Sequence, residues 1–302
     1  MLVPIKYNKR NYPAHIRSTI DEIAGHFDIA NITPSRDFCI HTEYSYGKRR
    51  FDSKLIEKFP DIQKAHKKYV PQLWFNYSWG EEFSEFIKEL CGEYKPKIIE
   101  IHPPFSDYTN NIESFLNVYD VFEAKIREYY PHIEIVIENR CGSIYTGGKF
   151  IISNTKDLIA LSDSISKRGL KLKIALDIPQ LITSYGGPTK LDAKKLLSIL
   201  NELNDIRGYV KSIHLWGKRK TTSGRTVSHV GDLTTYFDDK NKKQLFLGWF
   251  ASFVNDGNIR YFVPEVNSSD DDLWSIVYDL EENGIIFGQQ GAPPDRYSAG
   301  AP

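Results

Sequence analysis

The chain has 302 residues, of which 41% are hydrophobic, so it is long enough to bury a large core within one domain. Its 39 basic residues balance 39 acidic ones, which excludes a global electrostatic attraction for nucleic acid or an anionic membrane. The first ten residues lack the apolar core of a signal peptide, and no apolar stretch is as long as a membrane span. We therefore expect a cytoplasmic protein with no membrane partner. The odd number and wide spacing of Cys39, Cys91 and Cys141 argue against a disulfide framework or a cysteine zinc site.

From residue 38 onward, short β-branched runs alternate with longer amphipathic stretches, a pattern typical of repeated βα units. We predict a single-domain α/β fold, a (β/α)8 TIM barrel, over residues 1–287. Strands are expected at 38–43, 71–76, 97–102, 133–138, 172–177, 209–215 and 260–266. Helices are expected at 53–68, 81–93, 111–129, 155–168, 190–205, 242–256 and 270–282. The eighth strand is either Val3 to Tyr7 or Gly284 to Phe287, a choice that the sequence leaves open.

The segments after the expected strands are rich in Gly, Pro and aromatic residues, as are the loops that form barrel active sites. They are 103–108, 139–148, 178–188 and 216–232. The tail 288–302 has few large apolar residues, so we expect it to be disordered or to lie on the surface.

A carboxylate or an imidazole stands at or just past the end of four separate apolar runs. These residues are Glu138, Asp177, His214 and Glu265. The ends of parallel strands meet at one mouth of a barrel, so we expect the four side chains to converge. They form a mostly oxygen ligand set that suits one divalent metal, Mn²⁺, Mg²⁺, Zn²⁺ or Fe²⁺. Any one of them can instead cap a helix or pair with a basic residue, and His41, a lone histidine on an apolar strand, is expected to be structural.

In order and spacing, these motifs resemble the xylose isomerase-like TIM-barrel superfamily, which contains sugar isomerases and epimerases and the AP endonuclease family 2 enzymes such as endonuclease IV. The resemblance covers roughly residues 70 to 283. It implies that the four residues, placed on or after strands five to eight, hold one metal. Under this resemblance Glu138 and Glu265 are also the acid and base of the reaction.

The endonuclease IV branch adds ligands for a three-zinc cluster, and this chain matches them in part. His102 in EIHPPF and His229 in the loop after His214 match two of its histidines, as a second metal site or as residues behind the ligands. Gln180 and Val227 stand where that branch has a histidine and an aspartate, and its strand-three histidine falls at Gln72 or a neighbour. The third metal would keep only one ligand, so a trinuclear cluster is not expected.

Further residues near the expected strand ends are candidates for substrate binding. They are Gln180, Trp216, Lys218, Arg219 and Lys220. The amide can hydrogen-bond a hydroxyl but cannot carry a proton at neutral pH, and the indole can stack on a sugar or base. The basic residues can hold a phosphate or a carboxylate, although a solvated basic loop explains them equally simply.

The resemblance leads to two hypotheses of function, and a third comes from the barrel itself. The first is an isomerase or epimerase of a sugar or sugar derivative, with a small polyol or sugar as substrate and one metal polarising its oxygens. The alternative is an endonuclease IV-like phosphodiester hydrolase that acts on abasic or damaged DNA. A barrel that only binds a ligand is the third. The sequence leaves the substrate, the metal and the oligomeric state open.

Overall fold

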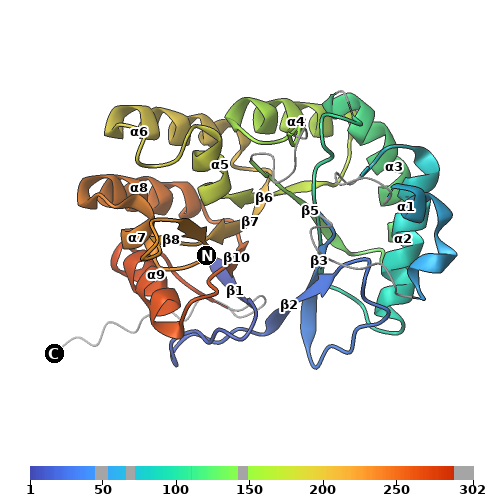
Figure 1. Ribbon diagram of the computed structural model, residues 1–302, viewed down its shortest axis with the longest axis horizontal. Coiled ribbons are helices and arrows are strands. Elements are labelled where there is room, and N and C mark those ends of the chain that lie inside the picture. The colour runs from blue at the N-terminus through green and yellow to red at the C-terminus, as the bar shows by residue number, and fades with distance from the viewer. Residues whose placement is uncertain (45–53, 66–71, 110, 142–148, 289–302) are drawn as a thin grey trace.

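Eight parallel strands form a closed barrel, the fold that the sequence predicts. The computed structural model describes residues 1–44, 54–65, 72–109, 111–141 and 149–288. The barrel strands are β1 (Leu2–Lys6), β2 (Ile20–Gly25), β3 (Asp37–Thr42), β4 (Ile98–Ile101), β5 (Glu134–Glu138), β6 (Lys173–Asp177), β7 (Val210–Leu215) and β10 (Arg260–Pro264). Neighbours in chain order pair with each other, and β10 closes the barrel against β1 (Figure 1). The C-terminal ends of all eight strands therefore lie at one mouth.

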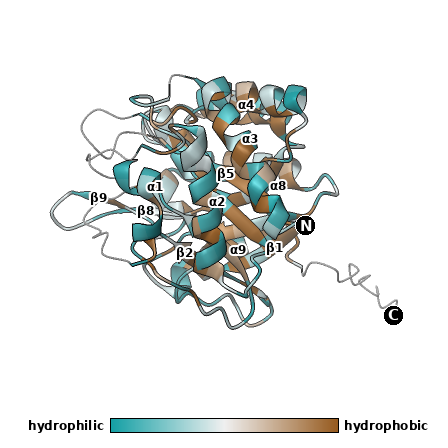
Figure 2. Ribbon diagram, turned by 90° about the vertical axis from the view of Figure 1, so that its right-hand side faces the viewer, coloured by the Kyte–Doolittle hydropathy of each residue, from teal (hydrophilic) through white to brown (hydrophobic). Residues whose placement is uncertain are grey.

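Helices surround most of the barrel (Figure 1). They are η1 (Ile56–Lys58), α1 (Pro60–Ala65), α2 (Tyr77–Cys91), α3 (Ile112–Tyr129), α4 (Thr155–Arg168), α5 (Ile178–Ser184), α6 (Ala193–Glu202), η2 (Leu203–Ile206), α7 (Leu233–Phe237), α8 (Lys240–Val254) and α9 (Asp270–Glu282). An antiparallel hairpin, β8 (Lys218–Lys220) with β9 (Thr226–Ser228), follows β7 and projects from the body of the molecule (Figure 2). In the part of the chain that the structure describes, no helix follows β1 or β2 directly.

Two helices begin and end where the sequence predicts, because their caps are encoded locally. The side chain of Asn154 accepts hydrogen bonds from the backbone N–H groups of Lys156 and Asp157, and Gly169 ends α4 in the left-handed conformation. Ser269 caps α9 in the same way as Asn154 caps α4, by accepting from the N–H of Asp272. Such signals lie within a few residues of the helix end, so they can be recognised without the fold.

The strand expected at 71–76 is wrong over its described part, residues 72–76. Asn76 is the N-cap of α2, and its side chain accepts from the N–H of Trp79, so this stretch leads into a helix. The strand that takes its place in the barrel is β2, whose polar residues Asp21 and Glu22 interrupt the apolar run that a buried strand normally shows. With β2 included, the stretch expected at 38–43 is the third strand of the barrel, β3.

The open choice for the eighth strand is resolved in favour of the N-terminus. β1 supplies the strand, whereas residues 284–287 contribute only an isolated bridge between Phe287 and Leu2. The expected loop 178–188 contains α5, and the loop 216–232 contains the β8–β9 hairpin. The helix expected at 53–68 is reduced to η1 and α1, with its ends outside the described residues. The expected tail lies outside them from residue 289 onward.

Two apolar clusters hold the barrel together. The larger lies between the strands and the helices, whose inner faces are hydrophobic and outer faces hydrophilic (Figure 2). The smaller lies inside the barrel and consists of Val3, Ile5, Ile20, Cys39, Ile98, Val136, Ala175, Tyr261 and Val263. Among the described helices, none has both the length and the apolar character needed to cross a membrane.

Candidate metal centre

Alternation along the strands points the candidate ligands into the barrel. On β5, Val136 belongs to the inner apolar cluster, and Glu138, two residues later, shares its face because strand side chains alternate with period two. On β6 the same step leads from Ala175 to Asp177. The same two-residue step places four more polar side chains on the inner face, since Ile20, Cys39, Ile98 and Val263 belong to the inner apolar cluster. These side chains are Glu22, His41, Glu100 and Glu265, and His102 follows Glu100 by a further two residues. A polar layer therefore lies on top of the apolar one, at the C-terminal mouth.

The structure brings together three of the four ligands expected from the sequence. Glu138, Asp177 and His214 each offer an atom, and these atoms lie within 4.8 Å of one another. All three side chains are fully buried. Glu265 lies beside them, with its Oε1 atom 3.5 Å from Nδ1 of His214. The convergence of these side chains at the mouth agrees with the expectation.

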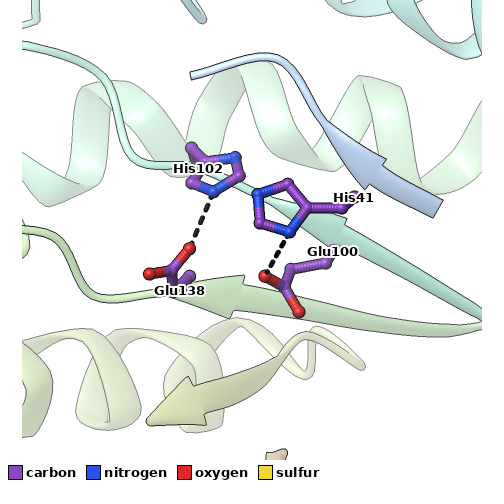
Figure 3. A group of neighbouring side chains, drawn as sticks. All are labelled: His41, Glu100, His102 and Glu138. Atoms are coloured by element: carbon purple, nitrogen blue, oxygen red, sulfur yellow. Dashed lines mark hydrogen bonds and ion pairs between the residues drawn. The ribbon is translucent and has the colours of Figure 1, made fainter. Parts of the chain in front are cut away.

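A second group of ligand-competent side chains shares Glu138 with the first. It consists of His41, Glu100, His102 and Glu138, again with ligand atoms within 4.8 Å of one another. Figure 3 shows the two imidazoles side by side, with His102 directed at Glu138 and His41 at Glu100. Nε2 of His102 lies 2.8 Å from Oε2 of Glu138, and Nδ1 of His41 lies 3.4 Å from Oε1 of Glu100. Glu138 is thus the one carboxylate common to both groups.

Sequence reasoning missed His41 and Glu100. The sequence predicts a structural role for His41 and places the strand-three histidine of the resemblance near Gln72, because β2 does not read as a buried strand and is missing from the predicted order of strands. On the observed barrel, the third strand is β3 and carries His41. Glu100 stands inside the apolar run IIEI, two residues before His102, and this spacing was the available signal.

Burial and neighbouring carboxylates shift the pKa values of the histidines in both groups. Burial alone would lower the pKa of His41, but Glu22 and Glu100 raise it to about 10. Glu100 and Glu265 likewise hold the pKa of His214 well above its ordinary value despite burial. For His102, burial prevails over Glu138 and lowers the pKa to about 4.

The pKa values of the carboxylates in and beside the first group shift in different directions. Burial would raise the pKa of Glu138, but Arg140 and His102 hold it well below its ordinary value. Burial, with Glu265 and Glu138 nearby, raises the pKa of Asp177 instead. The pKa of Glu265 is lowered to about 2, because His214 and His229 outweigh the effect of burial. Such crowding of buried carboxylates and imidazoles is typical of functional sites.

The donor set fits divalent cations. Among the described residues, both ring nitrogens of His41 and of His214 lack a hydrogen bond of good geometry, although carboxylates lie close to them. Nδ1 of His102 and Oε2 of Glu265 are also buried without one. Unpaired polar atoms at this depth are costly, and imidazole nitrogens beside carboxylate oxygens are the ligands that Zn²⁺, Mn²⁺ and Fe²⁺ bind.

Neighbouring side chains fix the candidate ligands in place. The amide of Asn139 forms two hydrogen bonds with the backbone of Asp177, which ties the end of β5 to the end of β6. Oδ1 of Asp177 caps α5 by accepting from the N–H of Gln180, and Oδ2 accepts from the indole N–H of Trp216 at 3.0 Å. The helix cap that the sequence allowed for Asp177 is therefore present, and each oxygen keeps a lone pair for a metal.

The remaining candidates lie around this centre at different depths. Trp216 is buried under Asp177 and stacks on His229, whose Nδ1 lies 3.1 Å from the backbone oxygen of Glu265. Gln180 accepts from Sγ of Cys141 at 2.9 Å. The three basic residues have different surroundings. Lys218 points inward and donates to Thr183, whereas Arg219 pairs with Asp272 and Lys220 is exposed. Val227 lies opposite Arg219 in the β8–β9 hairpin.

Comparisons with known proteins add little to this geometry. No family model matches the chain, and no curated protein matches it. Among solved structures, it is similar to a xylose isomerase domain protein from Planctomyces limnophilus. The two are 12% identical, the match covers 81% of this chain and 87% of that one, and the TM-score is 0.39. The closed parallel barrel is consistent with the xylose isomerase-like superfamily that the motifs resemble. A likeness this distant says nothing about shared chemistry.

Metal binding is expected to strengthen as pH rises. Metal binds neutral imidazole, whereas the raised pKa values of His41 and His214 keep both rings protonated at neutral pH. Each displaced proton changes the apparent affinity by about tenfold per pH unit below the pKa of its ring. Calorimetric titration with Mn²⁺ between pH 6 and pH 9 should show tighter binding at high pH and proton release into the buffer. A pH-independent affinity contradicts this assignment.

The metal-free protein should show the opposite trend through His41. Because its pKa rises from 6.5 to about 10 on folding, its contribution to stability is complete below pH 6.5 and is lost as the pH approaches 10. Chemical denaturation of metal-free protein at several pH values measures this loss. Stability that rises steadily over the same range contradicts it.

Gly217→Ala should disrupt the loop that carries His229. A Cβ atom on Gly217 would lie 2.3 Å from the backbone carbon of Gly231, and backbone cannot move aside as a side chain can. We expect a loss of about 2 kcal/mol or more in unfolding free energy, measured by urea denaturation. Gly248→Ala, on an exposed face of α8 with no atom near the added Cβ, is the control and should be neutral or stabilising. Equal stability of the two variants contradicts the expectation.

Proposed function

We propose that this protein is a divalent-metal-dependent enzyme that hydrolyses phosphate esters at a two-metal centre. The observation that carries the proposal is the position of Glu138, the one carboxylate common to both ligand-competent groups. His41, His102 and Glu138 would hold one cation, and Glu138, Asp177, His214 and Glu265 the other. Two neighbouring divalent cations supply charge stabilisation for both the attacking and the leaving oxygen of a phosphate ester.

The other residues of the centre support hydrolysis more than proton transfer between carbons. Glu138 contacts both Arg140 and His102, and its low pKa makes it a weak base, which is unfavourable for an enzyme that must remove a proton from carbon. A carboxylate whose pKa is held low would instead be well suited to holding divalent cations. Glu100, a member of the second group, also contacts the first, with Oε2 3.1 Å from Nε2 of His214 and Oε1 3.4 Å from Nδ1 of His41, so it can orient both imidazoles.

The isomerase or epimerase of a sugar or sugar derivative is the second candidate. The group of Glu138, Asp177 and His214, with Glu265 beside it, is sufficient for one metal without the second group. Under this hypothesis Glu138 and Glu265 are the candidate bases, and the pKa of each is held below its ordinary value in the metal-free protein. The substrate would be a small polyol or sugar.

Metal stoichiometry and a two-arm activity assay separate these functions. Purified protein is loaded with Zn²⁺ or Mn²⁺, freed of excess metal and analysed for metal content. One arm measures hydrolysis of bis(p-nitrophenyl) phosphate and nicking of an abasic-site DNA duplex, with and without a chelator. The other arm measures exchange of sugar C–H protons in deuterated water over a panel of aldoses and ketoses.

Two metals per chain with chelator-sensitive phosphate ester hydrolysis is the expected result. Nicking of the abasic duplex in addition would identify DNA as the substrate, as the endonuclease IV-like alternative requires. One metal per chain with sugar C–H exchange overturns the proposal in favour of the isomerase. Protein that binds no metal and gains no thermal stability from Mn²⁺ or Zn²⁺ leaves only the ligand-binding barrel.

A further inference from the structure

A buried guanidinium lies at the edge of the candidate metal centre. Arg140 follows β5 by two residues and is 6% exposed. Its Nη1 atom contacts both carboxylate oxygens of Glu138, at 3.2 and 3.3 Å, and its guanidinium lies 4.2 Å from the ring centroid of Tyr44. Among the described residues, its Nε atom is buried without a hydrogen-bond partner. A buried cation with an unused N–H group is a costly arrangement unless a ligand accepts from it.

The position of Arg140 shows which ligand suits it. The carboxylate that Arg140 contacts also lies 2.8 Å from Nε2 of His102, and the Tyr44 ring beside the guanidinium lies 4.8 Å from the ring of His102. The guanidinium is therefore next to the candidate centre. Lys218 lies over the ring of Trp216, whose indole donates to Asp177, so a second cation lies near the same centre. Arg219, by contrast, is engaged by Asp272.

We infer that Arg140 is an anion-binding residue that holds a phosphate oxygen of the substrate once metal cations have engaged Glu138. The inference rests on the proposed function and specifies its substrate class. Divalent cations held by Glu138 would supply the counter-charge that this carboxylate has from the guanidinium in the metal-free protein. The N–H groups of Arg140 would then be free to donate to a phosphate bound beside Glu138, and guanidinium binds tetrahedral oxyanions through a planar pair of donors.

Binding of inorganic phosphate to the loaded protein tests the inference without an activity assay. Wild-type protein, Arg140→Gln and Arg140→Lys are loaded with Zn²⁺, freed of excess metal, and analysed for metal content before calorimetric titration with phosphate. Arg127→Lys is the matched control, since Arg127 also pairs with a glutamate, Glu123, but on the outer helix α3. Metal-free wild-type protein is titrated in parallel.

We expect Arg140→Gln to weaken phosphate binding by roughly ten- to a hundredfold at unchanged metal content, the range for a hydrogen bond to a charged group. Arg140→Lys should lose less, because it keeps the charge and lacks only the planar donor pair. Arg127→Lys should bind as the wild type does, and metal-free protein more weakly. If Arg140→Gln loses metal or does not fold, Arg140→Lys alone decides.

Three outcomes overturn the inference. One is wild-type affinity for phosphate in both Arg140 variants at full metal content. Another is phosphate binding that is equally tight with and without metal, and a third is loaded wild-type protein that binds no phosphate. A wild-type protein that takes up no metal is a different result, since it removes the proposed two-metal function itself.

Discussion

Glu138→Gln is expected to lower phosphate ester hydrolysis by about a thousandfold and to reduce the bound metal to one weakly held ion or none. The variant keeps the side-chain volume but replaces a charged carboxylate by an amide, which is a poor ligand and cannot bridge two cations. Because Glu138 is the only residue common to both groups, this single change affects both metals. Metal analysis and the turnover of bis(p-nitrophenyl) phosphate measure the two effects.

Glu134→Gln is the control for this variant. Glu134 begins the strand that Glu138 ends, so it lies at the opposite end of the barrel. The control should keep its metal and its activity, and both variants should keep the fold by circular dichroism. Near-normal turnover in Glu138→Gln would exclude this residue from the centre.

His41→Ala and His102→Ala should each remove one metal and leave the other. Both imidazoles belong to the group on the β3 and β4 side, whereas Asp177 and His214 belong to the other group. We expect about a hundredfold loss of hydrolysis with each variant, since one of the two stabilising charges is lost. Metal content should fall from two ions to one. The affinity for the remaining ion should depend on pH through the protonation of His214.

His132→Ala, a change at an exposed position in the turn before β5, controls for the loss of an imidazole as such. It should leave metal content and turnover unaltered. Two metals retained in His41→Ala would show that His41 is a structural histidine, as the sequence suggested.

Local sequence signals were sufficient for the elements that carry most of the candidate centre. Four apolar runs of the sequence are the strands β5, β6, β7 and β10. Each run is buried, so its apolar composition alone identifies it as a strand. Their polar residues Glu138, Asp177, His214 and Glu265 lie at or next to the strand ends. The first residues of helices such as α4 and α9 can be recognised from the capping residues beside them. Period-two alternation then places these polar ends on the face that points into the barrel.

The second group depended on tertiary structure. On β2, Glu22 pairs with His41 on the inner face and Asp21 pairs with Arg36 on the opposite face, so the sequence of this strand does not read as a buried strand. Without β2 the strands cannot be counted correctly, and His41 cannot be assigned to the strand beside β4. Glu100 and Arg140 are ordinary charged residues in the sequence. Closure of the barrel brings Glu100 against His214, because residues far apart in the chain become neighbours only when the strands are paired. Arg140 contacts Glu138 from two residues along the chain, and its burial beside the candidate centre is what the fold decides.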